Sequence, residues 1–191
     1  PRSIVILTGA GISAESGVPT FRGVDGLWEG HRIEEVASPD AFRRKPELVH
    51  RFYNLRRAAL NTVEPNAGHL ALAKLEREWR GKFLLVTQNV DDLHERAGSE
   101  KLIHMHGELR KARCRNCGVV VSWTEDLSPA TCCPSCEETG DIRPHIVWFG
   151  EMPFELETIT NALKSADIFL CIGTSGVVYP AAGFAQTAAQ N

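Results

Sequence analysis

Short apolar runs recur along the chain and predict buried strands. They cover residues 3–8, 83–87, 102–106 and 168–172, and the chain returns to apolar character at 145–149. A run of this length, rich in β-branched or large apolar residues and without polar alternation, is typical of a strand buried on both faces.

Between these runs the apolar residues recur at helical spacing. Segment 46–60 carries Leu48, Val49, Phe52 and Leu55 on one stripe, and helices are also predicted at 12–16, 66–79, 153–165 and 179–190. Strands that alternate with helices favour an α/β fold with a parallel sheet and helices on both faces. Segment 19–31 is rich in Gly, Pro and Asp without a period, which indicates a long loop of the kind that often carries function.

Polar or glycine-rich clusters directly follow three of the predicted strands. Because the carboxyl ends of parallel strands meet at one edge, where open α/β sheets bind ligands, the clusters predict a ligand site there. They contain Gly9, Ala10, Gly11, Ser13 and Ala14 after the first strand, Gln88, Asn89 and Asp91 after the second, and Gly173, Thr174 and Ser175 after the last.

The first cluster is a glycine turn between a strand and a helix. Such a turn lets backbone N–H groups approach a phosphate, and Ala14 at its sixth position is compatible with dinucleotide binding. Ser13 and Arg22 offer further donors to a phosphate. The acidic residue expected about 20 positions on is not clear, because Glu29 lies in a loop. A tight turn without any ligand is therefore the alternative.

Composition and charge exclude some classes of protein. The 191 residues are 43% hydrophobic and 24% charged, which is the mixture of an ordinary globular domain. A net charge of −3 argues against a protein whose main partner is DNA or RNA. No apolar run approaches the roughly 18–20 residues of a membrane helix, so no membrane association is expected. Without a recognisable signal or transit peptide we expect a cytoplasmic protein, with a mitochondrial one as the alternative.

Four of the six cysteines are crowded into one short segment. Cys114 and Cys117 form one C-x-x-C pair, Cys133 and Cys136 form another, and 15 residues separate the two pairs. This spacing is typical of a zinc ribbon, in which four thiolates leave no open position, so we expect one structural Zn²⁺. Disulfides or redox dithiols are the alternative. Cys132 competes weakly as a ligand.

The entrance to this cysteine segment is basic, since it carries Arg110, Lys111, Arg113 and Arg115. A zinc ribbon with such an entrance supports a rival hypothesis, a nucleic-acid-binding module. The acidic chain as a whole argues against it, and the polar clusters at the strand ends would then have no purpose. The remaining cysteine, Cys171, lies in an apolar strand and is expected in the core.

Four segments in a fixed order resemble the sirtuins, a family of NAD-dependent protein lysine deacylases. They are the glycine turn extended to Gly17 with Thr20, Phe21 and Arg22, the segment 87–91, the pair His106 and Gly107, and the triplet 173–175, with the cysteine ribbon after His106. The similarity covers residues 4–182. It implies a Rossmann-type large domain and a small zinc-bearing domain, with NAD and acyl-lysine protein or peptide substrates meeting between them.

The resemblance also implies domain boundaries. We expect the Rossmann-type NAD-binding domain in residues 1–31, 83–108 and 143–191, a helical part of the small lobe in 32–82, and a zinc-ribbon module in 109–142.

Sirtuins normally continue with further Rossmann strands, so we expect C-terminal strands to be missing and activity to be impaired. An impaired fragment that serves as a binding module, mono-ADP-ribosyl transfer and a conventional NAD oxidoreductase are the alternative functions.

Several residues receive roles toward NAD from the resemblance. Asp91 would hold the nicotinamide carboxamide, Gln88 would face the ribose, and Asn89 would orient a water or a ribose hydroxyl. Phe21 would shield the reacting ribose carbon from water. Thr174 and Ser175 would bind the adenosine side.

The reaction implied by the resemblance begins when the acyl oxygen attacks C1′ of the nicotinamide ribose and nicotinamide leaves. An alkylimidate forms, and water completes the conversion to free lysine and O-acyl-ADP-ribose. His106 would be the general base on a ribose hydroxyl, because histidine accepts a proton near pH 7. His104 is the alternative, and His106 is preferred because Gly107 follows it. The other histidines, His50, His69, His94 and His145, are expected to be structural or on the surface.

One helix indicates the type of acyl group. Tyr53 and Arg56 are three residues apart on the predicted helix 46–60, so a phenol and a guanidinium share one face and can receive one carboxylate. This Tyr-x-x-Arg is similar to that of sirtuins that prefer succinyl, malonyl or glutaryl lysine, although acetyl-lysine stays open as a substrate. The alternative interpretation is that the pair merely covers a face of the helix.

The segment Val147, Trp148 and Phe149 resembles the strand that binds the substrate peptide in the family. An exposed strand edge can pair with an extended peptide through its main chain. The alternative is a core position, and at least one of the two aromatic side chains is expected to be buried.

Overall fold

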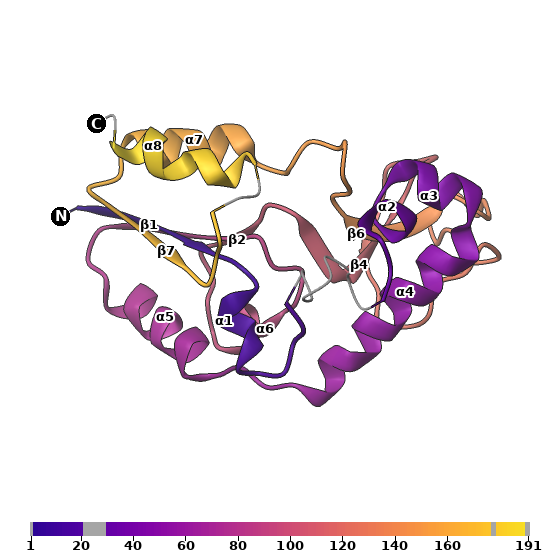
Figure 1. Ribbon diagram of the computed structural model, residues 1–191, viewed down its shortest axis with the longest axis horizontal. Coiled ribbons are helices and arrows are strands. Elements are labelled where there is room, and N and C mark those ends of the chain that lie inside the picture. The colour runs from indigo at the N-terminus through magenta and orange to yellow at the C-terminus, as the bar shows by residue number, and fades with distance from the viewer. Residues whose placement is uncertain (1, 21–29, 177–178, 190–191) are drawn as a thin grey trace.

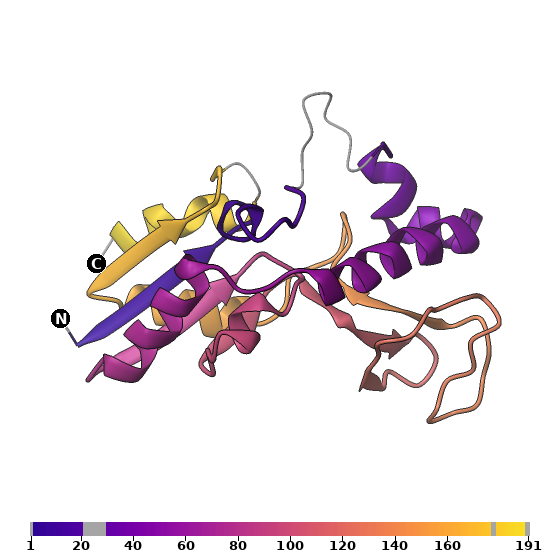
Figure 2. The same cartoon turned by 90° about the horizontal axis from the view of Figure 1, so that it is seen from below.

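A four-stranded parallel sheet forms the larger of two lobes (Figures 1 and 2). The computed structural model describes residues 2–20, 30–176 and 179–189. The strand order is β3-β2-β1-β7, with β1 (Ser3–Thr8), β2 (Lys82–Thr87), β3 (Leu102–His104) and β7 (Ile168–Ile172). All three pairings are parallel, so the carboxyl ends of the four strands meet at one edge. The predicted α/β fold is confirmed.

Helices cover both faces of this sheet (Figure 1). Side chains of β1 alternate between the faces: Ile4 and Ile6 pack with helix α5 (Ala67–Glu78), while Val5 and Leu7 pack with helices α7 (Leu156–Lys164) and α8 (Phe184–Ala189). Strand β1 is buried along its whole length. Burial on both faces explains why the sequence of this strand is a continuous apolar run. The shorter elements of this lobe are α1 (Gly11–Ala14), α6 (Leu93–Arg96) and a 3-10 turn, η2 (Ala181–Gly183).

The small lobe is built on a three-stranded antiparallel sheet in the order β5-β4-β6. Its strands are β4 (Gly107–Cys114), β5 (Val120–Ser122) and β6 (Ile142–Ile146). Helices α2 (Ile33–Val36), α3 (Pro39–Arg44) and α4 (Pro46–Ala59), with the 3-10 turn η1 (Leu60–Thr62), pack beside it. Their common core contains Phe42, Phe52, Tyr53, Leu109 and Trp148.

Helix α4 is fastened to the loop that follows β5. The side-chain amide of Asn54 donates to the Leu127 carbonyl at 2.8 Å, and its oxygen accepts the Leu127 N–H at 3.0 Å. The buried Arg57 donates to the carbonyls of Leu109 at 2.8 Å and Glu125 at 3.2 Å. The position of α4 is therefore tied to strand β4 and to the segment that leads into the second cysteine pair.

Two domain boundaries differ from those expected from the sequence. Helix α5 lies on the large sheet, where Leu72 packs against Ile4 and Leu85, so residues 67–78 do not belong with the helices of the small lobe. Strand β6 pairs with β4, so residues 142–146 belong to the small sheet. Neither helix spacing nor apolar character identifies the sheet against which an element packs.

Strand β7 is an edge of the sheet in the part of the chain that the structure describes. Its Leu170 is 39% exposed and its Cys171 is also exposed. The expectation that Cys171 is a core residue is therefore wrong. None of the helices among the described residues is long and apolar enough to cross a lipid bilayer.

Candidate active site between the two lobes

The polar clusters after β1 and β7 contact each other through their backbones. The N–H of Gly11 donates to the Gly173 carbonyl at 2.8 Å, and the N–H of Gly9 donates to the Ile172 carbonyl at 3.0 Å. A Cβ on Gly173 would lie 2.3 Å from the Ile12 nitrogen, and the φ of Gly173 is +65°. The glycines at these positions let the turns after β1 and β7 touch.

Replacing Gly173 with alanine is expected to lower the free energy of unfolding by about 3 kcal/mol or more, because a left-handed φ and a clash with backbone act together. Gly150→Ala is the matched control, since φ at Gly150 is +88° but nothing lies within 4 Å of the added Cβ. Its cost should be only about 1 kcal/mol. Denaturant unfolding of both variants measures the difference. Equal costs would show that the approach of the two turns is unimportant.

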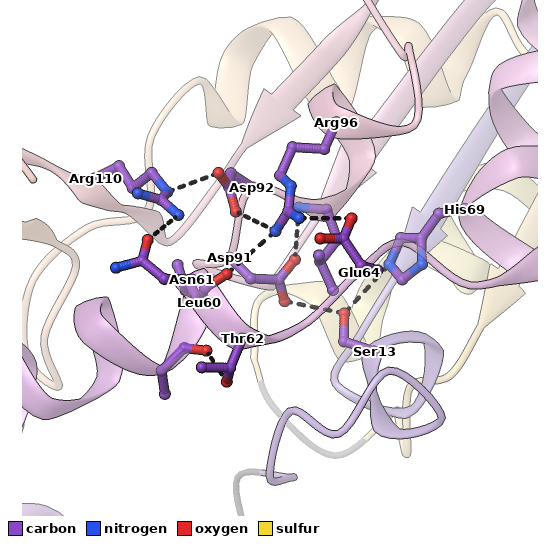
Figure 3. A network of polar contacts seen from close by, with 12 residues as sticks. Ser13, Leu60, Asn61, Thr62, Glu64, His69, Asp91, Asp92, Arg96 and Arg110 are labelled. Atoms are coloured by element: carbon purple, nitrogen blue, oxygen red, sulfur yellow. Dashed lines mark hydrogen bonds and ion pairs between the residues drawn. The ribbon is translucent and has the colours of Figure 1, made fainter.

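Ser13 is the centre of a buried hydrogen-bond network at the end of β1 (Figure 3). Its hydroxyl donates to Asp91 Oδ2 at 2.9 Å and accepts the side-chain amide of Asn89 at 3.1 Å. The ring of His69 contacts the same oxygen through Nε2 at 3.3 Å. Residues from three separate segments therefore meet at one hydroxyl.

The tautomer of His69 follows from its second contact. The backbone N–H of Asn66 points at His69 Nδ1 at 3.2 Å, so Nδ1 is the acceptor and Nε2 carries the proton that it donates to Ser13. Burial lowers the pKa of His69, which keeps this neutral form. From the sequence, His69 is expected to be structural or on the surface. The signal that could have placed it is Asn66, which caps helix α5 and forms a capping box with His69.

Asp91 is buried beside this network. Burial raises the pKa of its carboxyl, while the N–H of Leu93 at 3.1 Å and the hydroxyl of Ser13 act in the opposite direction by donating to the carboxylate. Gln88, the first residue of the turn after β2, donates from its side chain to the Thr174 hydroxyl at 2.9 Å. The predicted clusters after β1, β2 and β7 thus form one continuous site.

A group of ion pairs holds the neighbouring residue Asp92 (Figure 3). Arg110 of β4 contacts it through Nε at 2.7 Å, and Arg96 of α6 donates to the Leu60 carbonyl at 3.2 Å and pairs with Glu64 at 2.8 Å. These contacts connect α6, the end of α4 and the small sheet. The turn that carries Asp91 is therefore anchored from both lobes.

His106 lies between β3 and β4, beside the same turn. Its Nδ1 is 3.2 Å from the Gln88 carbonyl, and a carbonyl only accepts, so Nδ1 carries the proton and Nε2 is the basic nitrogen. Burial lowers the pKa of His106. His104, the alternative candidate, directs both ring nitrogens elsewhere, to the Asn89 carbonyl at 3.1 Å and to Glu95 at 2.6 Å.

The remaining residues predicted for this edge differ in their exposure. Gly9 is buried, Ala10 is half-buried, and Ala14 and Ser175 are exposed. Phe21 and Arg22 lie outside the described residues.

Tyr53 and Arg56 both face the interior of the small lobe. Tyr53 is fully buried, and its oxygen accepts the indole N–H of Trp148 at 2.9 Å. Arg56 is 8% exposed, its guanidinium stacks 3.2 Å above the centre of the Phe52 ring, and it donates to the Phe52 carbonyl at 2.8 Å. Both side chains are therefore packed inside the lobe and are not part of a solvated surface.

The segment after β6 is not a strand. Trp148 is buried, as expected for one of the two aromatic residues, and Phe149 is 50% exposed. The three backbone N–H groups have partners within the chain: Val147 donates to the His106 carbonyl, Trp148 to Glu151 and Phe149 to the Ala37 carbonyl. The expected peptide-binding edge is thus engaged by the chain itself in this structure.

The four predicted metal ligands form one cluster. The sulfurs of Cys114, Cys117, Cys133 and Cys136 all lie within 4.8 Å of one another, and two pairs are 3.8 Å and 3.7 Å apart. Tetrahedral zinc with Zn–S bonds of about 2.3 Å separates its sulfurs by about 3.8 Å. The cluster therefore fits a structural zinc. Cys132 lies outside it and contacts the Glu137 carbonyl instead.

Comparisons with known proteins agree with this geometry. The Sir2 family model matches residues 9–180. The NAD-dependent protein deacylase of Vibrio parahaemolyticus is 58% identical over 98% of this chain and 78% of its own length. That of Bdellovibrio bacteriovorus is 60% identical over 98% and 80%, and that of Escherichia coli is 58% identical over 97% and 67%.

Two solved structures have the same fold. A Sir2 homologue in complex with NAD superposes with a TM-score of 0.89 at 45% identity, covering 99% of this chain and 74% of that chain. A mutant Sir2 homologue in complex with ADP-ribose superposes with a TM-score of 0.90 at 44% identity, covering 99% and 76%.

Proposed function

The chain belongs to the Sir2 family and is an NAD-dependent protein deacylase, and from this premise we propose that it favours acidic acyl groups on lysine. The preferred groups are succinyl, malonyl and glutaryl, and acetyl is the weaker substrate. The products are free lysine, nicotinamide and the O-acyl ester of ADP-ribose.

The observation that carries this proposal is the buried pair Tyr53 and Arg56. A guanidinium in an aromatic interior attracts a carboxylate far more strongly than one in water, because the surrounding dielectric is low. Burial raises the pKa of Tyr53, so the phenol stays protonated and able to donate. A planar cation and a neutral hydroxyl together are suited to one terminal carboxylate and have no matching partner in an acetyl group.

The acyl preference is tested by the double variant Tyr53→Phe with Arg56→Met. Loss of a charge-assisted hydrogen bond costs about 1.5–3 kcal/mol, so the succinyl-to-acetyl ratio of kcat/KM should fall about tenfold to a hundredfold. Matched succinyl- and acetyl-lysine peptides with NAD, followed by mass spectrometry, give this ratio.

Arg51→Met is the matched control, because Arg51 lies on the same helix but is exposed. It should leave the ratio unchanged. If the double variant keeps the wild-type ratio, or slows both substrates equally, the assignment of the acyl carboxylate to this pair is wrong.

The residues at the sheet edge suit NAD. Ser13, Asn89 and Asp91 form a buried polar group at the carboxyl ends of parallel strands, which is where dinucleotides bind in this type of fold. When bound, NAD supplies the reactive ribose carbon and the nicotinamide leaving group. In our proposal Asp91 receives the nicotinamide carboxamide, Asn89 orients a water or a ribose hydroxyl, and Gln88 contacts the ribose.

His106 is the proposed general base. Its Nδ1–H is held by the Gln88 carbonyl, which directs the basic Nε2 away from that carbonyl. The lowered pKa of His106 keeps Nε2 unprotonated near neutral pH, so it can take a proton from a ribose hydroxyl. For the peptide we propose that Phe149, which is half exposed beside Trp148, contacts the substrate main chain.

A further inference from the structure

Two histidines hold two consecutive carbonyls of the turn after β2. His106 donates from Nδ1 to the Gln88 carbonyl at 3.2 Å, and His104 donates from Nδ1 to the Asn89 carbonyl at 3.1 Å. The backbone of the turn is therefore fixed by a pair of imidazoles two residues apart. The proposed reaction uses only one of them.

His104 differs from His106 in the partner of its second ring nitrogen. Its Nε2 lies 2.6 Å from Glu95 Oε1, while its Nδ1 faces a carbonyl. Both partners are acceptors, so both nitrogens of His104 carry a proton and the ring is an imidazolium. Glu95 lies on α6, the helix that begins two residues after Asp91, so this ion pair ties the helix to the end of β3.

The charged groups around His104 favour its protonated form. Glu95 faces it from α6 and Glu108 from β4, while His94 lies near it from α6. Burial alone would lower the pKa of His104, but the hydrogen bond and charge of Glu95 outweigh burial and raise it. The same bond holds the pKa of the Glu95 carboxyl below its usual value, although burial acts in the opposite direction. The raised pKa of His104 and the lowered pKa of Glu95 both indicate that the two side chains form an ion pair.

The charge of His104 also reaches Asp91. Its positive ring acts to lower the pKa of the Asp91 carboxyl and so opposes the effect of burial, while Glu95 acts in the opposite sense. Loss of the proton on His104 would therefore remove this effect and raise the pKa of the Asp91 carboxyl further.

The oxygens and nitrogen of Glu95, His104 and Glu108 lie close enough to surround a cation, within 4.8 Å of one another. However, the Glu95 carboxylate already accepts from His104, and Glu108 pairs with Lys111 at 2.7 Å. These contacts favour an ion pair over a metal site.

We propose that His104, kept as an imidazolium by Glu95, is a positioning residue that holds the Asn89 carbonyl and thereby sets the turn carrying Gln88, Asn89 and Asp91. It acts through this turn and does not touch the reacting atoms. The inference rests on the proposed role of the turn in NAD binding. It predicts a pH dependence of its own: when His104 loses one proton, the remaining proton stays on Nε2 beside the Glu95 carboxylate, so Nδ1 no longer donates to the Asn89 carbonyl and the turn loosens.

The first experiment compares His104→Ala with His104→Asn. The asparagine amide can replace Nδ1–H at the Asn89 carbonyl, but it carries no charge and does not reach Glu95. His104→Ala should lower kcat/KM for NAD about tenfold to a hundredfold, and His104→Asn should recover to within about threefold of the wild type. Initial rates with both acetyl- and succinyl-lysine peptides make the result independent of the acyl preference. Equal impairment of the two variants, or less than a twofold effect of His104→Ala, would overturn the proposal.

The second experiment is the pH profile of Glu95→Gln. Without the carboxylate, neutral His104 can keep its proton on Nδ1 and go on donating to the Asn89 carbonyl, so the alkaline limb of kcat/KM for NAD should be absent in Glu95→Gln, as it should be in His104→Asn. Glu78→Gln, an exposed change on α5, is the matched control. A profile of Glu95→Gln that superposes on the wild type would contradict the role of Glu95.

Direct NAD binding separates this inference from the proposed function. Asp91→Asn tests the nicotinamide site itself. If Asp91→Asn weakens NAD binding and His104→Ala does not, the positioning role fails while the proposed site stands. If Asp91→Asn binds NAD as tightly as the wild type, the proposed nicotinamide site is wrong.

Discussion

Replacing His106 with alanine should lower kcat/KM for deacylation by about a hundredfold to ten-thousandfold, the range that one general base contributes. The reason is that Nε2 is the basic nitrogen left when Nδ1–H is held by the Gln88 carbonyl. Release of free lysine from a succinyl-lysine peptide with NAD measures the loss.

His106→Asn is the sharper variant, because its amide can still donate to the Gln88 carbonyl but has no basic nitrogen. It should be as inactive as His106→Ala while its thermal midpoint and NAD affinity stay close to the wild type. Retention of more than about a tenth of the wild-type rate by His106→Asn would contradict the assignment.

The wild-type pH profile gives a second check on His106. Because burial lowers its pKa, the base is still unprotonated at the ordinary histidine pKa of about 6.5, and the acid limb of kcat/KM should lie below that pH. An acid limb well above this value would show that another group controls the reaction.

Removing the zinc ligand Cys133 should unfold the small lobe. Structural zinc in isolated fingers contributes about 10–16 kcal/mol, which is comparable with the whole stability of a domain. Cys133 is completely buried between β5 and β6, so Cys133→Ser leaves the cluster incomplete in the interior. The zinc content per chain, the thermal midpoint and the deacylation rate should all fall.

Cys132→Ser is the matched control for this prediction. Cys132 is the adjacent residue but lies outside the four-sulfur cluster. This variant should retain one zinc per chain and the wild-type rate. Loss of zinc from Cys132→Ser, or one tightly bound zinc in Cys133→Ser, would mean that the ligand set is wrong.

Strand β1 can be predicted from the sequence because it is buried along its whole length and therefore forms a continuous apolar run. Strand β1 is predicted at residues 3–8 and found at Ser3–Thr8, and helix α4 is predicted from residue 46 and begins at Pro46. The spacing of the four cysteines likewise predicts a single cluster of four sulfurs. In these places a local pattern alone determines the structure.

Other features depend on contacts between distant segments. His69 has no sequence neighbour that reveals its bond to Ser13, which exists only because α5 packs on the β1 face of the sheet. The short helix α3 was missed, although Ser38 caps it and Pro39 starts it, because six residues carry too little periodicity. The segment 147–149 has strand character, yet its N–H groups are used by three different parts of the chain.

The attachment of α4 to the loop after β5 links the evolution of the cysteine segment to that of the proposed acyl-binding pair. Asn54 is bonded twice to Leu127, and the preceding residue on the helix is Tyr53, to which we assign the acyl carboxylate. Under that assignment, a change in the length or geometry of this loop should shift α4 and, with it, Tyr53. Natural variation in the metal-bearing loop should accordingly covary with acyl selectivity, and a loop graft between relatives offers a way to transplant selectivity without altering a single residue that meets the acyl chain.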